Sequence, residues 1–125
     1  MYCFSTLDQF SAIRESIKEE LIRIYGEDSL QVFVAINEGV NNAIFHGNKE
    51  DGSKKVYLTI EELPNGIKIV IRDEGQGFIS QEIPDTIPWF EEHGRGLQLI
   101  QYYVDSYEFN GLGNELTLIK KRDIA

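Results

Sequence analysis

The spacing of apolar residues changes near residue 50, and this change constrains the fold more than any other feature of the chain. Between residues 6 and 25, apolar residues recur every three or four positions, as on a helix that buries one face, and residues 29–46 are rich in apolar residues. From residue 55 they alternate with polar residues, as on strands that bury one face. Helices followed by hairpins predict an α+β fold, in which helices cover one face of a sheet.

The expected elements follow from this spacing and from the turn residues. We expect helices over residues 6–25 and 29–46, ended by Gly26 and by Gly47 as C-terminal caps. One hairpin should span residues 55–71 around a Pro-Asn-Gly turn, and another residues 105–121. Between the hairpins lie a loop of lid length, residues 79–93, and a short helix over about 96–103. The predicted architecture is a two-layer α/β sandwich with a mixed, mostly antiparallel sheet, formed by residues 1–125 as a single domain.

Composition narrows the class of protein. The chain has 125 residues, 42% of them hydrophobic, which is enough for a packed core. Its net charge of −9 disfavours direct binding to nucleic acid, whose phosphates need a positive surface. One cysteine, Cys3, excludes an internal disulfide and fits a reducing compartment. No apolar run approaches the length of a membrane span, so we expect a soluble, cytoplasmic protein without membrane contact.

Polar residues interrupt the second predicted helix. Glu38 and Asn42 are four residues apart, so their side chains lie on one helix face, and His46 continues the same row. Asn41 lies beside them in a segment otherwise rich in Val, Ile and Phe. A buried amide needs hydrogen-bonding partners, so these residues are candidates for a ligand site. The alternative is a polar stripe that faces solvent, or an amide satisfied inside the protein.

Two glycine-rich segments follow. Asp73-Glu74-Gly75-Gln76-Gly77-Phe78 comes directly after a strand, where an aspartate can accept a hydrogen bond from a base and glycines let a planar ligand approach. Gly94-Arg95-Gly96-Leu97 opens a helix, where exposed N–H groups and the helix dipole suit a phosphate. Each segment alone is equally compatible with an ordinary turn.

The order of these three motifs carries more information than any one of them. The chain has no P-loop sequence and no Gly-x-Gly-x-x-Gly segment that opens a helix after an early strand. Instead, the helix with Glu-x-x-x-Asn, the Asp-x-Gly-x-Gly segment, the lid-sized loop and the Gly-x-Gly-Leu segment together resemble the GHKL ATPase superfamily. The Asn-Ala-x-x-His-Gly sequence at residues 42–47 is most similar to the anti-sigma-factor serine kinases.

The resemblance implies roles for individual residues. Asn42 would ligate Mg²⁺ on the triphosphate of ATP, and Glu38 would orient or deprotonate the attacking hydroxyl. Asp73 would accept a hydrogen bond from the adenine amino group, with Gly77 giving room beside the base. The other nucleotide-binding residues that it implies are Asn41, His46, Gly75, Phe78, Gly94, Arg95, Gly96 and Leu97.

The resemblance also implies a function and partners. It implies a serine/threonine kinase that sequesters a sigma factor and phosphorylates a protein antagonist of anti-sigma factors. The alternatives are a non-catalytic module that senses ATP or ADP, a detached histidine-kinase catalytic domain, and a degenerate member that serves only as a scaffold. Members usually begin with a full edge strand that forms a homodimer, whereas only Tyr2 to Ser5 is available here, so a homodimer is one option among the oligomeric states.

Overall fold

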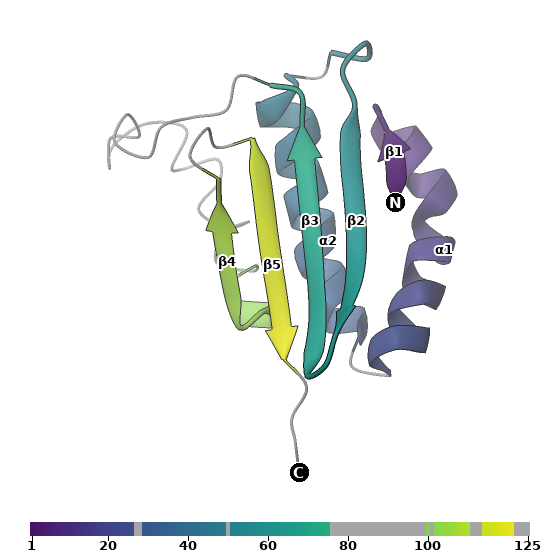
Figure 1. The fold of residues 1–125 in the computed structure, drawn as a ribbon. Helices are drawn as coiled ribbons and strands as arrows, with labels where there is room; N and C mark the ends of the chain where they lie inside the picture. The colour runs from purple at the N-terminus through teal and green to yellow at the C-terminus, as the bar shows by residue number, and fades with distance from the viewer. Residues whose placement is uncertain (27–28, 50, 76–99, 101, 111–113, 122–125) are drawn as a thin grey trace.

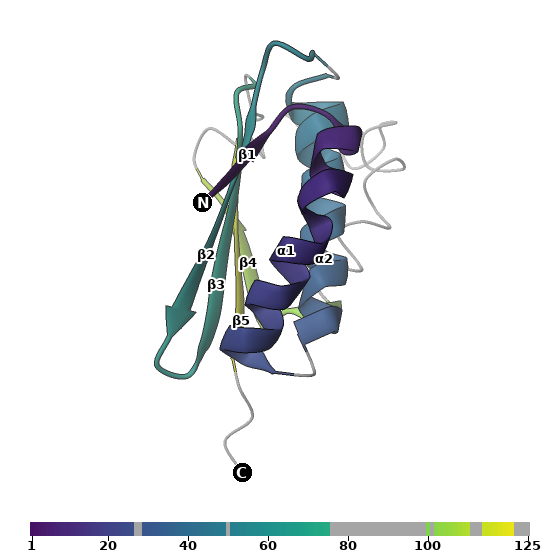
Figure 2. The same ribbon diagram turned by 90° about the vertical axis from the view of Figure 1, so that its right-hand side faces the viewer.

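A computed structural model describes residues 1–26, 29–49, 51–75, 100, 102–110 and 114–121, and for His46 the backbone only. The chain folds into two layers (Figures 1 and 2). One layer is a five-stranded sheet in the order β1-β2-β3-β5-β4, and the other contains two helices. The strands are β1 (Tyr2–Phe4), β2 (Val56–Leu63), β3 (Gly66–Asp73), β4 (Ser106–Phe109) and β5 (Glu115–Lys121).

Both long helices cover the same face of the sheet. Figure 2 shows α1 (Leu7–Tyr25) and α2 (Ser29–Asn42) side by side on one side of the strands. The predicted α+β sandwich is therefore confirmed. The predicted sheet was mixed, but every strand pairing in the described residues is antiparallel. In the part of the chain that the structure describes, no helix combines the length and the apolar content needed to cross a membrane.

The first helix begins and ends where the sequence predicts. Thr6 is its N-cap, and its hydroxyl accepts a hydrogen bond from the backbone N–H of Gln9 at 3.1 Å. The Gln9 side chain accepts in turn from the backbone N–H of Ser5 at 2.6 Å, an arrangement similar to a capping box. Gly26 ends the helix with φ at +105°, a backbone conformation that glycine adopts without strain.

The core lies between the two layers. Alternate residues of the strands point toward the helices and are buried, which confirms the predicted alternation. Each fully buried Ile, Leu or Phe contributes about 1.5–3 kcal/mol relative to an exposed one. The largest fully buried side chains are Phe10, Ile17, Leu21, Ile36, Leu58, Ile67, Ile69, Ile100 and Leu118.

A glycine brings α2 close to the centre of the sheet. A Cβ atom on Gly39 would lie 2.6 Å from Cδ1 of Ile71 and 3.3 Å from Cδ2 of Leu116. The absence of a side chain at this position lets the helix backbone approach β3 and β5. The helix that carries Glu38 and Asn42 therefore lies over β3, the central strand of the sheet (Figure 1).

The end of the second helix differs from the prediction. The α-helix stops at Asn42, and residues Ala43–Gly47 form a π-helical turn, η1. The backbone N–H of Asn48 donates to the carbonyl of Ala43, five residues earlier, at 2.8 Å. Gly47 was predicted to be the C-terminal cap, but it lies inside this wider turn and Asn48 follows as the cap. Turns of this kind are rare and often occur at functional sites.

The two predicted hairpins are confirmed. β2 and β3 pair across a turn at Pro64 and Asn65, with Leu63 opposite Gly66. β4 and β5 form the second hairpin, and β5 pairs with β3. A short first strand of three residues is present within Tyr2 to Ser5, the only residues available for it before the first helix. The predicted lid loop lies outside the described residues, as does most of the predicted short helix, of which Ile100, Tyr102 and Tyr103 are described as helical.

Candidate functional site

Asp73 is a buried carboxylate at the end of β3. It follows Ile69 and Ile71 on the helix-facing side of the strand and is 7% exposed. Its backbone N–H donates to the carbonyl of Asn114 at 2.9 Å, which fixes the strand end against the start of β5. Its Oδ1 accepts a hydrogen bond from the backbone N–H of Gly75 at 2.8 Å. The predicted base-recognition residue is therefore held in place by backbone groups on both sides.

Two glycines enclose this carboxylate. A Cβ atom on Gly47 would lie 2.1 Å from Oδ2 of Asp73, and one on Gly75 would lie 1.9 Å from the carbonyl oxygen of Gly47. Real Cβ atoms do not approach other atoms this closely, so neither position accepts a side chain without movement. The loop after β3 and the last turn of the second helix are thus in direct backbone contact.

Burial changes the acidity of Asp73. Desolvation raises the pKa of its carboxyl group from 3.8 to about 6, while the Gly75 N–H and the positive charge of Lys54 act in the opposite direction. Above pH 6 the group is mainly ionised, so both of its oxygens accept hydrogen bonds. A buried, ionised carboxylate with a perturbed pKa in a close-packed junction is a functional-site candidate.

The second helix carries the other candidate residues and ends close to Asp73. Glu38, Asn41 and Asn42 are all half-buried. Glu38 and Asn42 are separated by about one turn, roughly 6 Å along the helix axis. The π-helical turn continues from Asn42 to Gly47, which touches Asp73. The structure thus brings the end of the Asn-bearing helix to the Asp73–Gly75 segment.

Several predicted site residues belong to the part of the chain that the structure does not describe. The side chain of His46 is not described, and Gly77, Phe78, Gly94, Arg95, Gly96 and Leu97 lie outside the described residues. Their roles, and the catalytic and metal-binding roles of Glu38 and Asn42, remain predictions.

Asn48 is a residue of this region that the sequence did not indicate. The residue is polar, yet it is only 2% exposed. The amide donates to the carbonyl of Lys55 at 3.1 Å and accepts from the backbone N–H of Glu74 at 2.8 Å. Asparagine often satisfies backbone groups at the ends of helices, and that preference was the available signal. The partners are seven and 26 residues away in the chain, so only the fold shows them.

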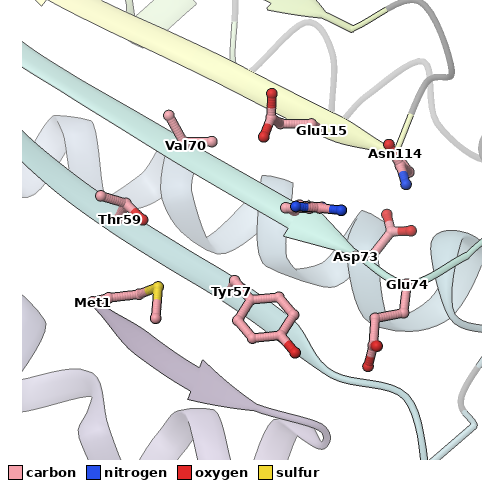
Figure 3. Close-up of a pocket in the computed structure, with 9 residues that line it drawn as sticks. Met1, Tyr57, Thr59, Val70, Asp73, Glu74, Asn114 and Glu115 are labelled. Atoms are coloured by element: carbon pink, nitrogen blue, oxygen red, sulfur yellow. The ribbon is translucent and has the colours of Figure 1, made fainter.

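A hollow of about 600 Å³ lies on the face of the sheet that the helices leave uncovered, and Asp73 at the end of β3 also lines it (Figure 3). It is not the predicted nucleotide cleft, because neither Glu38 nor Asn42 lines it. Its lining mixes Arg72 with acidic and apolar residues, and we assign no ligand to it. The lining residues are Met1, Tyr57, Thr59, Val70, Arg72, Asp73, Glu74, Asn114 and Glu115.

Comparison with known families decides what kind of domain this is. Residues 3–120 match the sequence profile of the histidine kinase-like ATPase domain. This chain belongs to the histidine kinase-like ATPase family. The two helices over an antiparallel sheet agree with that assignment. Membership in this family implies that the domain binds ATP.

More specific relatives are distant. The domain is 26% identical over 102 residues to the anti-sigma F factor of Bacillus subtilis, covering 75% of this chain and 70% of that protein. It is also 26% identical over 99 residues to the anti-sigma F factor of Anoxybacillus flavithermus, covering 75% of this chain and 68% of that protein. The anti-sigma F factor of Shouchella clausii is 29% identical over 82 residues, 62% of this chain and 56% of that protein. The histidine kinase-like ATPase domain therefore resembles anti-sigma F factors.

Proposed function

We propose that this ATPase domain binds Mg·ATP and transfers the terminal phosphoryl group to a serine or threonine of a partner protein. One observation carries the proposal: Gly47 lies against the carboxylate of Asp73. This contact joins the helix that carries Glu38 and Asn42 to a buried acceptor suited to a base. A nucleotide bound at Asp73 would extend its phosphates toward residues of the same helix.

The residues at the junction fit a nucleotide. Ionised Asp73 is an acceptor for the amino group of adenine, and it is buried enough for that hydrogen bond to be strong. Gly47 and Gly75 carry no side chain that could separate the helix end from this carboxylate. The side-chain oxygen of Asn42 suits Mg²⁺, which commonly takes one or two protein ligands and would neutralise charge on the triphosphate. Gly94, Arg95, Gly96 and Leu97 would supply backbone N–H groups to the phosphates.

The proposed role of Glu38 is that of the general base. Its carboxylate would accept the proton of the attacking hydroxyl, whose oxygen forms a bond to the terminal phosphorus of ATP. The bond from that phosphorus to the β,γ-bridging oxygen breaks, and ADP leaves with the electron pair. Positioning and charge neutralisation account for most catalysis of this kind, so few residues suffice.

The partners are proposed from the anti-sigma F factors. We propose that the ATP-bound domain holds a sigma factor in the cytoplasm and phosphorylates an antagonist of anti-sigma factors. Phosphorylation adds about −1.5 to −2 charges to the product, and a kinase with net charge −9 would favour its release. A pull-down from the native cytoplasm with ATP and then with ADP should recover partners that exchange with the nucleotide.

A Glu38→Gln variant separates binding from catalysis. We expect it to bind ATP within about threefold of the parent but to lose at least about 100-fold in transfer rate, because it keeps the shape and removes the base. Labelled ATP and candidate antagonist proteins provide the measurement, with phosphoserine as the product. Glu61→Gln, at an exposed position of β2, is the matched control. Equal transfer by the Glu38→Gln variant and the parent would exclude Glu38 as the base.

An Asn42→Ala variant tests the metal assignment. We expect the affinity for ATP in the presence of Mg²⁺ to fall at least tenfold, and the gain in affinity that Mg²⁺ gives the parent to disappear. Calorimetric titration with and without Mg²⁺ measures both quantities. Unchanged Mg²⁺-dependent binding would show that Asn42 is not the ligand. If the parent binds ATP and never transfers phosphate, the domain is a nucleotide sensor or needs the phospho-accepting helices of a histidine kinase.

A further inference from the structure

Asn48 lies where three separate segments of the chain meet. It follows the π-helical turn, precedes the connection to β2, and contacts the loop after β3. Its backbone N–H donates to Ala43 at 2.8 Å, and its carbonyl accepts from Asp51 at 3.0 Å. The side chain makes two further hydrogen bonds, to Lys55 and Glu74, so both the backbone and the side chain of Asn48 are hydrogen-bonded.

The side-chain bonds of Asn48 form part of a closed ring. The Asn48 amide donates to the carbonyl of Lys55, the N–H of Lys55 donates to a carboxylate oxygen of Glu74, and the N–H of Glu74 donates back to Asn48. Each member holds the next, so the backbone at Glu74 is fixed relative to the helix end. Glu74 follows Asp73 directly at the end of β3 (Figure 3). The next residue, Gly75, donates the hydrogen bond that orients the buried carboxylate of Asp73.

We propose that Asn48 is a positioning residue for base recognition in this domain. It holds the backbone of Glu74, and through it the Gly75 N–H, so that Asp73 keeps one orientation toward the base. This inference rests on the proposed binding of ATP at Asp73. Asn48 has no contact with Glu38 or Asn42 among those described, so its role concerns recognition of the base and not transfer of phosphate.

The chemistry of the site explains why asparagine serves here. One side chain must donate to a carbonyl and accept from an N–H, and an amide does both. Aspartate would lack the donor for Lys55, and alanine would lack both groups. The bonds to Lys55 and Glu74 are only part-buried, and both partners are exposed residues, so water can replace the lost bonds. We therefore expect truncation to free the loop while leaving the fold in place.

The test compares two nucleotides. Asp73 accepts from the amino group of adenine, whereas guanine presents a carbonyl oxygen at that position and is rejected. An Asn48→Ala variant should bind Mg·ATP about tenfold more weakly than the parent, while its affinity for Mg·GTP should change little. The ratio of the ATP affinity to the GTP affinity should therefore fall about tenfold. The transfer rate at saturating ATP should stay within about twofold of the parent, which places the loss in binding.

The control separates positioning from general destabilisation. Ile67→Ala removes a fully buried side chain at the opposite end of β3 and should lower the melting temperature without touching the junction. At a temperature where both variants remain folded, Ile67→Ala should have the same ratio of ATP affinity to GTP affinity as the parent. Should Asn48→Ala fail to fold, Asn48→Ser provides the same comparison, because its shorter hydroxyl cannot span both partners.

The outcomes are distinct. A parent protein that does not bind ATP overturns the proposed function and this inference with it. A parent that prefers ATP, with Asn48→Ala showing the same preference or losing both nucleotides equally, overturns the inference alone. A lower ratio of ATP affinity to GTP affinity in Asn48→Ala, together with an unchanged ratio in Ile67→Ala, supports the positioning role of Asn48.

Discussion

A Gly75→Ala variant is expected to lose about 3 kcal/mol of folding free energy and to bind ATP at least about 100-fold more weakly than the parent. The reason is steric: the new Cβ would lie 1.9 Å from the carbonyl oxygen of Gly47 and 2.9 Å from Oδ1 of Asp73. The first obstacle is backbone, which cannot rotate away as a long side chain would. The loop must therefore separate from the helix end, and the hydrogen bond from Gly75 to Asp73 is lost with it.

Gly52 provides a matched control. It is exposed, and a Cβ placed on it meets no atom within 4 Å. Gly52→Ala should leave both stability and ATP affinity unchanged, whereas Gly75→Ala should lower the melting temperature by roughly 10 °C. Thermal unfolding followed by circular dichroism, and calorimetric titration with Mg·ATP, measure the two effects. Similar behaviour of the two variants would show that the close contact between Gly75 and Gly47 does not exist in solution.

An Asp73→Asn variant is expected to be more stable than the parent at pH 7.5 and to bind ATP about 100-fold more weakly. The pKa of the carboxyl group is 3.8 when solvated and about 6 in the folded protein, so the folded protein binds more protons between these pH values. Stability therefore falls as pH rises through this window, and the loss is complete above pH 6.

The size of the stability gain follows from the same pKa difference. The values of 3.8 and about 6 correspond to about 3 kcal/mol, and we expect about 2 kcal/mol because solvent still reaches part of the side chain. Asparagine removes the buried charge and keeps an oxygen for the Gly75 N–H. Its remaining group is an NH₂, which meets the amino group of adenine donor to donor, so binding is lost.

Measurements at two pH values check both effects. At pH 7.5, urea unfolding should show Asp73→Asn as the more stable protein, and at pH 4 the difference should vanish because the parent carboxyl is then neutral as well. ATP affinity of the parent should fall as pH drops below about 6. Asp51, exposed and with its pKa lowered by hydrogen bonds from Ser53, is the control, and Asp51→Asn should not gain stability. A parent and an Asp73→Asn variant of equal stability at both pH values would contradict a buried, ionised Asp73.

Local patterns predicted most of the secondary structure. In α1, the spacing of the buried apolar residues and the end at Gly26 depend on residues a few positions apart. In β2, β3 and β5, the alternation of buried and exposed residues depends on neighbours within each strand. The end of the second helix was the error. Its apolar spacing continues past Asn42, but the backbone widens into a π-helical turn where it packs against the end of β3. Such a change is decided by contacts with a distant segment, and the local spacing does not show it.

The candidate site divides in the same way. Its chemical groups were readable, because an amide one turn after a carboxylate on a helix and an aspartate before spaced glycines are unusual locally. Gly47 was interpreted as a cap, whereas its position against Asp73 gives the reason for a glycine there. Asn48 was missed because its side chain binds two segments that lie close only in the folded protein.

The sequence by itself determined the element order, the buried faces and the three motifs, since each depends on residues a few positions apart. Only the tertiary structure decided that Gly47 and Gly75 close around Asp73, that burial raises the pKa of this carboxyl group, and that Asn48 ties the loop to the helix. Desolvation and steric contact depend on which distant atoms become neighbours, and that information arises when the helices pack on the sheet.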